Sequence, residues 1–197
     1  PQDIPFLENP NEFTLDVSYS LKLSDYFGLA VTGRYLMSDV KLQSVDSDSD
    51  SASSFAVDIS GFYQSQEKAY KTFRGLWRAG FNISNLGPRM KYEELGRKNF
   101  IPTNFKIGSA FDFIFDTSNK VSLNLELNKL LVPSPSIPIK NSNGQIIGYN
   151  QSDVDFLSGI FKSFGDAPNG FSEELEEITV SFGLEYLYNN SFAIRAG

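Results

Sequence analysis

The stretch from residue 103 to 132, TNFKIGSAFDFIFDTSNKVSLNLELNKLLV, constrains the fold more than any other part of the chain. Large apolar side chains recur at every second position on both sides of a short polar connection, and mostly small or polar residues fill the positions between them. A period of two indicates β-strands whose two faces meet different surroundings. The sequence therefore predicts an antiparallel hairpin that turns at DTSNK. Its arms of about ten to twelve residues are long enough for a tilted strand to cross a bilayer.

Further segments alternate in the same way, so we expect eight strands in all. Their connections are short near residues 25, 118 and 190, intermediate near 69, and long after the second, fourth and sixth strands. Outer-membrane barrels alternate short periplasmic turns with long extracellular loops in this manner. The sequence thus predicts an all-β fold, an antiparallel transmembrane β-barrel with long extracellular loops. The expected strands cover residues 12–23, 27–38, 55–63, 77–83, 105–115, 121–128, 178–188 and 191–197.

Alternation alone does not tell which face of the sheet is enclosed. A soluble lipocalin-like barrel turns its apolar face inward around a ligand, whereas a membrane barrel turns it outward against lipid. Two features favour the outward arrangement: aromatic residues near the short turns, as interfacial girdles require, and mid-strand charges of both signs on the other face, which can pair across strands. The aromatic residues are Tyr26, Phe27, Tyr63, Trp77, Phe115, Tyr188 and Phe192. The expected lumen charge network comprises Asp16, Arg34, Asp58, Arg78, Lys106, Asp112, Glu126 and Glu185, joined by Arg195.

The composition argues against several classes of function. A net charge of −7 disfavours nucleic acid as a partner, because phosphate contacts need a basic face. The chain has no cysteine and no histidine, which removes thiolate metal sites and both Ser-His-Asp and Cys-His nucleophiles. Three aspartates in the loop after the second strand, at positions 46, 48 and 50, begin like an EF-hand, but Ser51 and Val57 occupy the Gly and Glu positions of that motif. We therefore expect neither an enzyme nor a bound cofactor or metal.

The longest connection, residues 133–175, contains one amphipathic pattern. Ser152 and Asp155 fit a capping box, and an apolar stripe at helical spacing follows and stops at Gly165. The stripe consists of Phe156, Leu157, Ile160, Phe161 and Phe164. A short helix here either packs on the barrel rim or offers a docking surface to another protein. The SEELEEI run that follows, residues 172–178, is interpreted as a hydrated rim.

Five segments carry a resemblance to a known family: NPNEFTLDVSYSLKLSDYFGLAVTGRYL, SSFAVDISGFYQ, FNISNLGPRMKY, IPTNFKIGSAFDF and LNKLLVPSP. In this order they are similar to the PorV family, outer-membrane β-barrels of the type IX secretion system of Bacteroidetes. The family's barrel is similar to FadL-type transporters of long-chain fatty acids and has about fourteen strands. With eight strands recognised here, we expect residues 1–197 to form a single β-barrel domain that lacks N-terminal strands and a C-terminal portion.

The resemblance implies a carrier rather than an enzyme. PorV-like proteins receive secreted proteins from the translocon barrel through the cargo's C-terminal signal domain, then pass them to the attachment complex. The implied partners are therefore the translocon barrel, attachment-complex proteins, cargo signal domains, and outer-membrane lipid or lipopolysaccharide. The implied location is the bacterial outer membrane, with the loops facing the cell exterior. Because buried aromatic side chains dominate interface energetics, we expect Phe156, Phe161, Phe164 and Phe171 to contact partners.

Two alternatives remain open at this point. A FadL-like transporter of hydrophobic small molecules would need an apolar path through the lumen, which the mid-strand charges oppose. An outer-membrane enzyme acting on lipopolysaccharide would need a nucleophile and a base, and the sequence offers no such pair.

Overall fold

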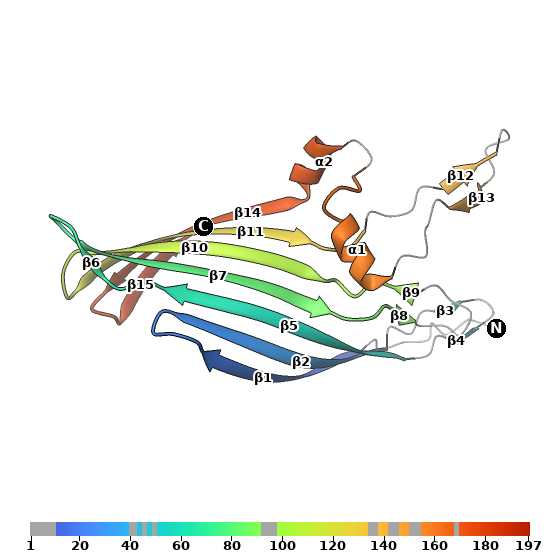
Figure 1. Cartoon of the computed structure of the whole chain (residues 1–197), viewed down its shortest axis with the longest axis horizontal. Helices are drawn as coiled ribbons and strands as arrows, with labels where there is room; N and C mark the ends of the chain where they lie inside the picture. Colours follow the sequence, from blue (N-terminus) through green and yellow to red (C-terminus); the bar gives the residue numbers. More distant parts are fainter. Residues whose placement is uncertain are drawn as a thin grey trace, which may run out of the picture.

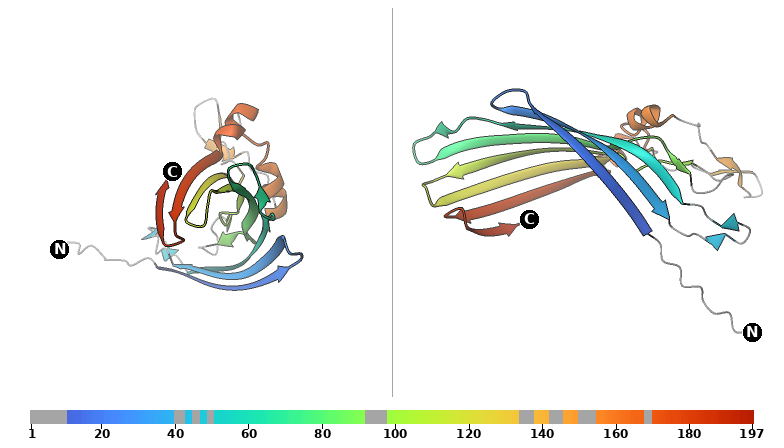
Figure 2. Two further views of the ribbon diagram at one scale, coloured as in Figure 1. Left: turned by 90° about the vertical axis from the view of Figure 1, so that its left-hand side faces the viewer. Right: turned by 90° about the horizontal axis from the view of Figure 1, so that it is seen from below.

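One curled antiparallel sheet forms most of the structure, a computed structural model that describes residues 11–39, 43–44, 47–48, 51–91, 98–133, 138–141, 146–149, 155–167 and 170–197. Eight long strands follow one another in chain order as a meander (Figure 1). They are β1 (Asn11–Lys22), β2 (Phe27–Asp39), β5 (Ala52–Gln64), β7 (Arg74–Leu86), β10 (Asn104–Ile114), β11 (Asn119–Leu130), β14 (Ile178–Tyr188) and β15 (Phe192–Ala196). The predicted all-β fold is confirmed, with a barrel-like wall that stays open between β1 and β15, the two ends of the arc in Figure 2.

Smaller elements lie at the two ends of this sheet. β6 (Lys68–Ala69) pairs with β7 at the short-turn end. The long connections hold three two-stranded ladders and two helices. The ladders are β3 (Gln43–Ser44) with β4 (Ser47–Asp48), β8 (Met90–Lys91) with β9 (Lys98–Asn99), and β12 (Pro138–Lys140) with β13 (Ile146–Tyr149). The helices are α1 (Phe156–Lys162) and α2 (Phe171–Glu176). Among the described residues, neither helix is long and apolar enough to span a membrane.

The strand bounds differ from the expected ones mainly in the middle of the sheet. β5 begins at Ala52 and β7 ends at Leu86, so both extend several residues beyond the alternating apolar pattern. Apart from Leu86, the residues in these extensions are small or polar, and they become strand because neighbouring strands offer ladder hydrogen bonds. The strands β1, β2, β5, β7, β10, β11 and β14 have 11 to 13 residues. Tilted by about 40°, a strand of this length rises about 30 Å, which matches the hydrocarbon core of a bilayer.

The short turns have clear local causes. The Asp116 carboxylate accepts the backbone N–H groups of Ser118 and Asn119 at 2.7 and 2.8 Å, which closes the turn between β10 and β11. The turn between β14 and β15 places Asn189 and Asn190 at φ of 49° and 51°, a conformation that asparagine tolerates better than most residues. These turns fix the register of both hairpins.

The two faces of the sheet differ sharply in exposure. In the apolar row, Val17, Phe55 and Phe182 are 72%, 70% and 61% exposed, whereas Asp112 in the charged row is only 2% exposed. Side chains on the concave side of a curved sheet crowd one another, and those on the convex side spread apart. The charged row therefore lies on the concave face and the apolar row on the convex face, as the membrane interpretation of the sequence requires.

Aromatic side chains cluster on the apolar face at the short-turn end. The Trp77 and Phe111 rings lie 4.7 Å apart between centroids, and Phe73 stacks on Tyr70 at 4.8 Å and contacts Phe113 at 5.1 Å. Such a belt of amphipathic and aromatic rings is typical of a membrane–water interface. The cluster thus marks one edge of the expected bilayer-facing band.

Candidate docking surface at the long-loop end

Arg34 is the centre of the charge network on the concave face. Its guanidinium donates to both oxygens of Asp16 on β1 at 2.9 and 2.8 Å, approaches Asp58 on β5 at 3.2 Å, and donates to the Asn85 amide oxygen on β7 at 2.5 Å. A planar guanidinium suits such a bidentate contact with a carboxylate. One side chain on β2 therefore joins four strands of the wall.

The other predicted lumen charges are also paired. Arg78 donates to the buried Asp112 at 2.5 Å, and Lys120 lies 3.9 Å from the same carboxylate. Two further pairs cross neighbouring strands: Lys106 with Glu126 at 3.3 Å, and Arg195 with Glu185 at 2.5 Å. Each of these carboxylates has a cationic neighbour, so the arrangement neutralises charge and supplies no closely spaced acid–base pair.

A β-bulge connects this network to the long-loop end. Between the pairs Val57–Leu86 and Ile59–Ile83, two residues of β7 lie opposite Asp58 alone. One of the two is Asn85, at a left-handed φ of 59°, and the Asp58 carboxylate accepts its backbone N–H at 2.8 Å. Asn85 also bonds to both Pro102 and Thr103.

Asn85 therefore brings the two ends of the connection from residue 87 to 103 to one point of the wall, and the described residues of this connection, 87–91 and 98–103, pack inward. Gly87 is buried so close to β5 that an added Cβ would lie 2.4 Å from the Phe55 carbonyl oxygen. Met90 and Ile101 pack with Ala52 and the partly buried Leu36 in a small apolar core. Leu36 and Ala52 belong to the concave row of β2 and β5, so Met90 and Ile101 occupy part of the lumen at the long-loop end.

Helix α1 is held on this connection by a close glycine contact. A Cβ added to Gly159 would lie 2.9 Å from the Phe100 ring and 3.1 Å from Pro133, so only a glycine lets the helix approach this closely. Ser163, one turn later, is fully buried and donates to the Ile160 carbonyl at 2.7 Å. The buried side of α1 is thus the side of Gly159 and Ser163.

The predicted apolar stripe of α1 is split by this packing. Phe156 and Ile160 are partly buried, whereas Leu157, Phe161 and Phe164 are 50%, 75% and 54% exposed. The predicted capping box is wrong about where the helix begins. Asp155 is the N-cap and makes no side-chain capping bond, and Ser152 lies outside the described residues. The helix therefore starts at Phe156, and tertiary packing rather than a cap fixes its position.

Helix α2 occupies the SEELEEI run, which was expected to be a hydrated rim. The helix starts after Gly170, whose φ of 81° suits glycine, and it exposes Phe171 (78%) and Leu175 (51%) on one side. Glu174 on another side is only 8% exposed. Its carboxylate accepts the Ala167 backbone N–H at 2.9 Å and a hydrogen bond from Lys129 at 3.0 Å.

These contacts, the Ala167 N–H first, lower the pKa of Glu174 below its ordinary value. Glu174 departs from the hydrated-rim interpretation because Lys129 gives its carboxylate a buried partner, whereas Glu176 and Glu177 are exposed, as that interpretation expects.

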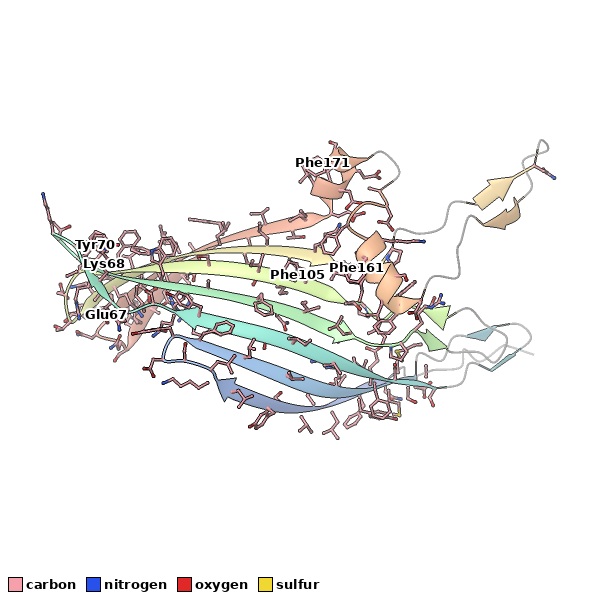
Figure 3. The ribbon with its side chains drawn as sticks, viewed as in Figure 1. Glu67, Lys68, Tyr70, Phe105, Phe161 and Phe171 are labelled. Carbon is pink, nitrogen blue, oxygen red and sulfur yellow. The ribbon has the colours of Figure 1, made fainter. Side chains whose placement is uncertain are left out.

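We call the exposed apolar side chains of the two helices and of the turn that follows α1 the loop surface. Figure 3 labels Phe161 and Phe171 at one end of the sheet, with Glu67, Lys68 and Tyr70 at the opposite end. The loop surface comprises Leu157, Phe161, Phe164, Phe171 and Leu175. Sequence reasoning reached its three phenylalanines but missed Leu175, and it missed the charged residues that hold α2. The sequence did contain one sign of a buried partner for Lys129, because this lysine follows Val121, Leu123, Leu125 and Leu127 in the apolar row of β11.

Metal-binding potential is small in the part of the chain that the structure describes. No group of three or more Asp, Glu, His or Cys residues is arranged there to hold a metal ion. Of the EF-hand-like aspartates, Asp46 and Asp50 lie outside the described residues.

Comparison with known proteins decides the family. A family model described as type IX secretion system protein PorV matches residues 1–137. The match covers more than half of the chain, from before β1 to beyond the end of β11. The chain belongs to the PorV family. It is therefore an outer-membrane component of the type IX secretion system, not a member of a known enzyme family. A search of curated proteins gave no match to this PorV-family chain.

The extent of the family match separates two parts of the structure. The Arg34 network and the connection from 87 to 103 lie inside the matched residues. The loop surface and α2 lie beyond residue 137, outside the family match.

Proposed function

We propose that this chain is a carrier of the type IX secretion system. It binds secreted cargo through the cargo's C-terminal signal domain, receives it from the translocon barrel and passes it to the attachment complex. In this proposal the loops face the cell exterior and the convex apolar face contacts lipid or lipopolysaccharide. No catalytic step on the chain itself is required.

The observation that carries the proposal is the loop surface. Five large apolar side chains are each at least half exposed on two short helices and the turn after the first of them, outside the sheet. A helix of six or seven residues gains little stability from its own hydrogen bonds, so its apolar side chains normally pack inward. Exposed aromatic side chains on anchored helices are the residue types that become anchors when a partner covers them.

The same geometry distinguishes the four aromatic contacts expected from the sequence. Phe161, Phe164 and Phe171 are available to a partner, whereas Phe156 is partly buried in the packing of α1. Replacing Phe156 is therefore expected to loosen α1, and replacing the other three is expected to remove contacts.

The test is a titration of the purified chain in lipid nanodiscs with a cargo C-terminal signal domain. The variant Phe161→Ser/Phe164→Ser/Phe171→Ser should bind at least about thirtyfold more weakly, since a buried aromatic anchor contributes about 2 kcal/mol or more. Tyr70→Ser is the matched control, an aromatic side chain that is 44% exposed at the opposite end of the sheet. All variants should keep heat-modifiable migration of the folded sheet. Equal affinities for the triple variant and the native chain would refute the loop surface as the contact.

The second candidate is a FadL-like transporter, and one hollow bears on it. The concave face holds a hollow of about 560 Å³. Its lining combines Gly80, Gly108 and Gly183 with the charged Arg78, Lys106 and Glu126. Small residues make room for a ligand, but the three charges oppose passage of an alkyl chain. Retention of radiolabelled palmitate without retention of cargo domains would favour the transporter.

A further inference from the structure

Lys129 is unusual among the lysines of this wall. It continues the apolar row of β11 after Leu127 and pairs in register with Ile178 and Phe105. Nevertheless it is only 6% exposed. Lysine is almost never buried without a partner, so the groups that cover Lys129 must supply one.

Those groups come from the segment around α2. The Lys129 ammonium lies 3.0 Å from the Glu174 carboxylate and 2.6 Å from the Glu177 carboxylate. Glu174 also accepts the backbone N–H of Ala167, which precedes the helix. Lys129, at the end of β11, therefore holds α2 at Glu174 and at Glu177, the residue that follows its last turn. Through Glu174 it also holds the chain at Ala167, before the helix.

The apolar side chains of α2 provide no comparable anchor. The helix has six residues, and its apolar side chains Phe171 and Leu175 are exposed rather than packed on the wall. Helices of this length do not persist without tertiary contacts. The ion pairs with the buried Lys129 thus fix the position of α2, and with it the direction in which Phe171 is presented.

We propose that Lys129 is the positioning residue of the loop surface: its ion pairs with Glu174 and Glu177 hold α2 on the end of β11 so that Phe171 and Leu175 meet the cargo domain. This inference rests on the proposed carrier function for the identity of the bound partner. The latch itself, formed by Lys129, Glu174 and Glu177, follows from the contacts alone.

Two readouts test the latch and its role separately. The chain contains no cysteine, so Ser172→Cys places a single spin label on the exposed side of α2 without a background signal. Label mobility reports whether α2 is held, and titration with a cargo C-terminal signal domain reports docking. Both are measured on the full chain in lipid nanodiscs. The informative variant is Lys129→Met, which keeps a long side chain but removes the charge.

Lys106→Met is the matched control. Lys106 lies on the neighbouring strand and pairs with Glu126, but both side chains are over 40% exposed, and their ion pair joins β10 to β11 rather than to α2. Lys129→Met should mobilise the label and weaken cargo binding about tenfold or more, because α2 must then be ordered on binding. Lys106→Met should change neither readout. Lys129→Arg, which keeps the charge, should restore most of the affinity, and Glu174→Gln/Glu177→Gln should reproduce the loss.

Three results would overturn the inference in distinguishable ways. An immobile label with unchanged affinity in Lys129→Met would show that the lysine does not hold α2. A mobile label with unchanged affinity would show that α2 is held by Lys129 but is not positioned for docking. If the native chain binds no cargo domain, the carrier function fails together with the docking role, while the label still decides whether the latch exists.

Discussion

Gly87 offers a sharp test of how the long-loop end is built. It is buried, and a Cβ at this position would lie 2.4 Å from the Phe55 carbonyl oxygen and 3.1 Å from the Ala56 Cα. Both neighbours are backbone atoms of β5, so neither can rotate away as a side chain would. Gly87→Ala must therefore shift either β5 or the backbone around position 87.

The expected cost follows from that overlap. A carbon–oxygen contact about 1 Å too short in a packed site costs about 1–3 kcal/mol when the surroundings must move. The loss corresponds to roughly a fivefold to hundredfold change in the folded-to-unfolded ratio. Gly33→Ala is the matched control, because nothing lies within 4 Å of the Cβ it would add. At position 33 the same substitution is expected to be neutral or to stabilise the fold by less than about 1 kcal/mol, because alanine lowers the conformational entropy of the unfolded chain.

The assay is equilibrium urea unfolding in lipid vesicles, followed by the fluorescence of Trp77, the single tryptophan of the chain. Trp77 lies in the aromatic cluster at the opposite end of the sheet, so it reports unfolding of the wall rather than local change near Gly87. Gly87→Ala should unfold at a lower urea concentration than the native chain, and Gly33→Ala should not. Equal unfolding free energies for the two variants would refute the close approach of Gly87 to β5.

Two further predictions concern the helices. Gly159→Val should detach α1 from Phe100 and Pro133, because its Cβ alone would lie 2.9 Å from the ring. Limited proteolysis should then cut near α1 faster while unfolding of the wall is unchanged, and an unchanged cleavage rate would contradict the packing. The second prediction concerns pH. In the folded chain the pKa of Glu174 lies below its ordinary value of 4.5. The contribution of Glu174 to holding α2 is therefore complete above pH 4.5 and is lost as the pH falls through the lower, folded-state pKa. A spin label at position 172 should stay immobile from pH 8 to 5 and become mobile only in stronger acid; release near neutral pH would show that other groups control α2.

The strands could be predicted from sequence because their cause is local. The alternation of side chains in a segment such as 121–128 predicts which face of the sheet each residue takes, and the paired asparagines at 189 and 190 predict where a hairpin turns. Resemblance to the PorV family in segments such as FNISNLGPRMKY was likewise readable, and the family match confirmed it.

The site was less predictable because its causes are distant in sequence. Burial of Glu174 depends on Lys129, 45 residues earlier, and the position of α1 depends on contacts of Gly159 with Phe100 and Pro133. A run such as SEELEEI carries no sign of which glutamate will be covered. The bulge at Asn85 was missed for the same reason, since the Asp58 carboxylate that accepts its N–H lies 27 residues away.

The central claim is that the apolar, convex face of the wall contacts lipid while the charged, concave face does not. Neighbouring positions in the middle of β11 test it directly, because the side chains of Asn124 and Leu125 take opposite faces and the chain has no native cysteine. Single-cysteine variants at the two positions, carrying the same fluorophore in lipid vesicles, are exposed to a lipid-borne quencher and to an aqueous one. We expect the lipid-borne quencher to reduce the fluorescence of the label at 125 and the aqueous quencher to reduce that of the label at 124. The reverse pattern would contradict the claim.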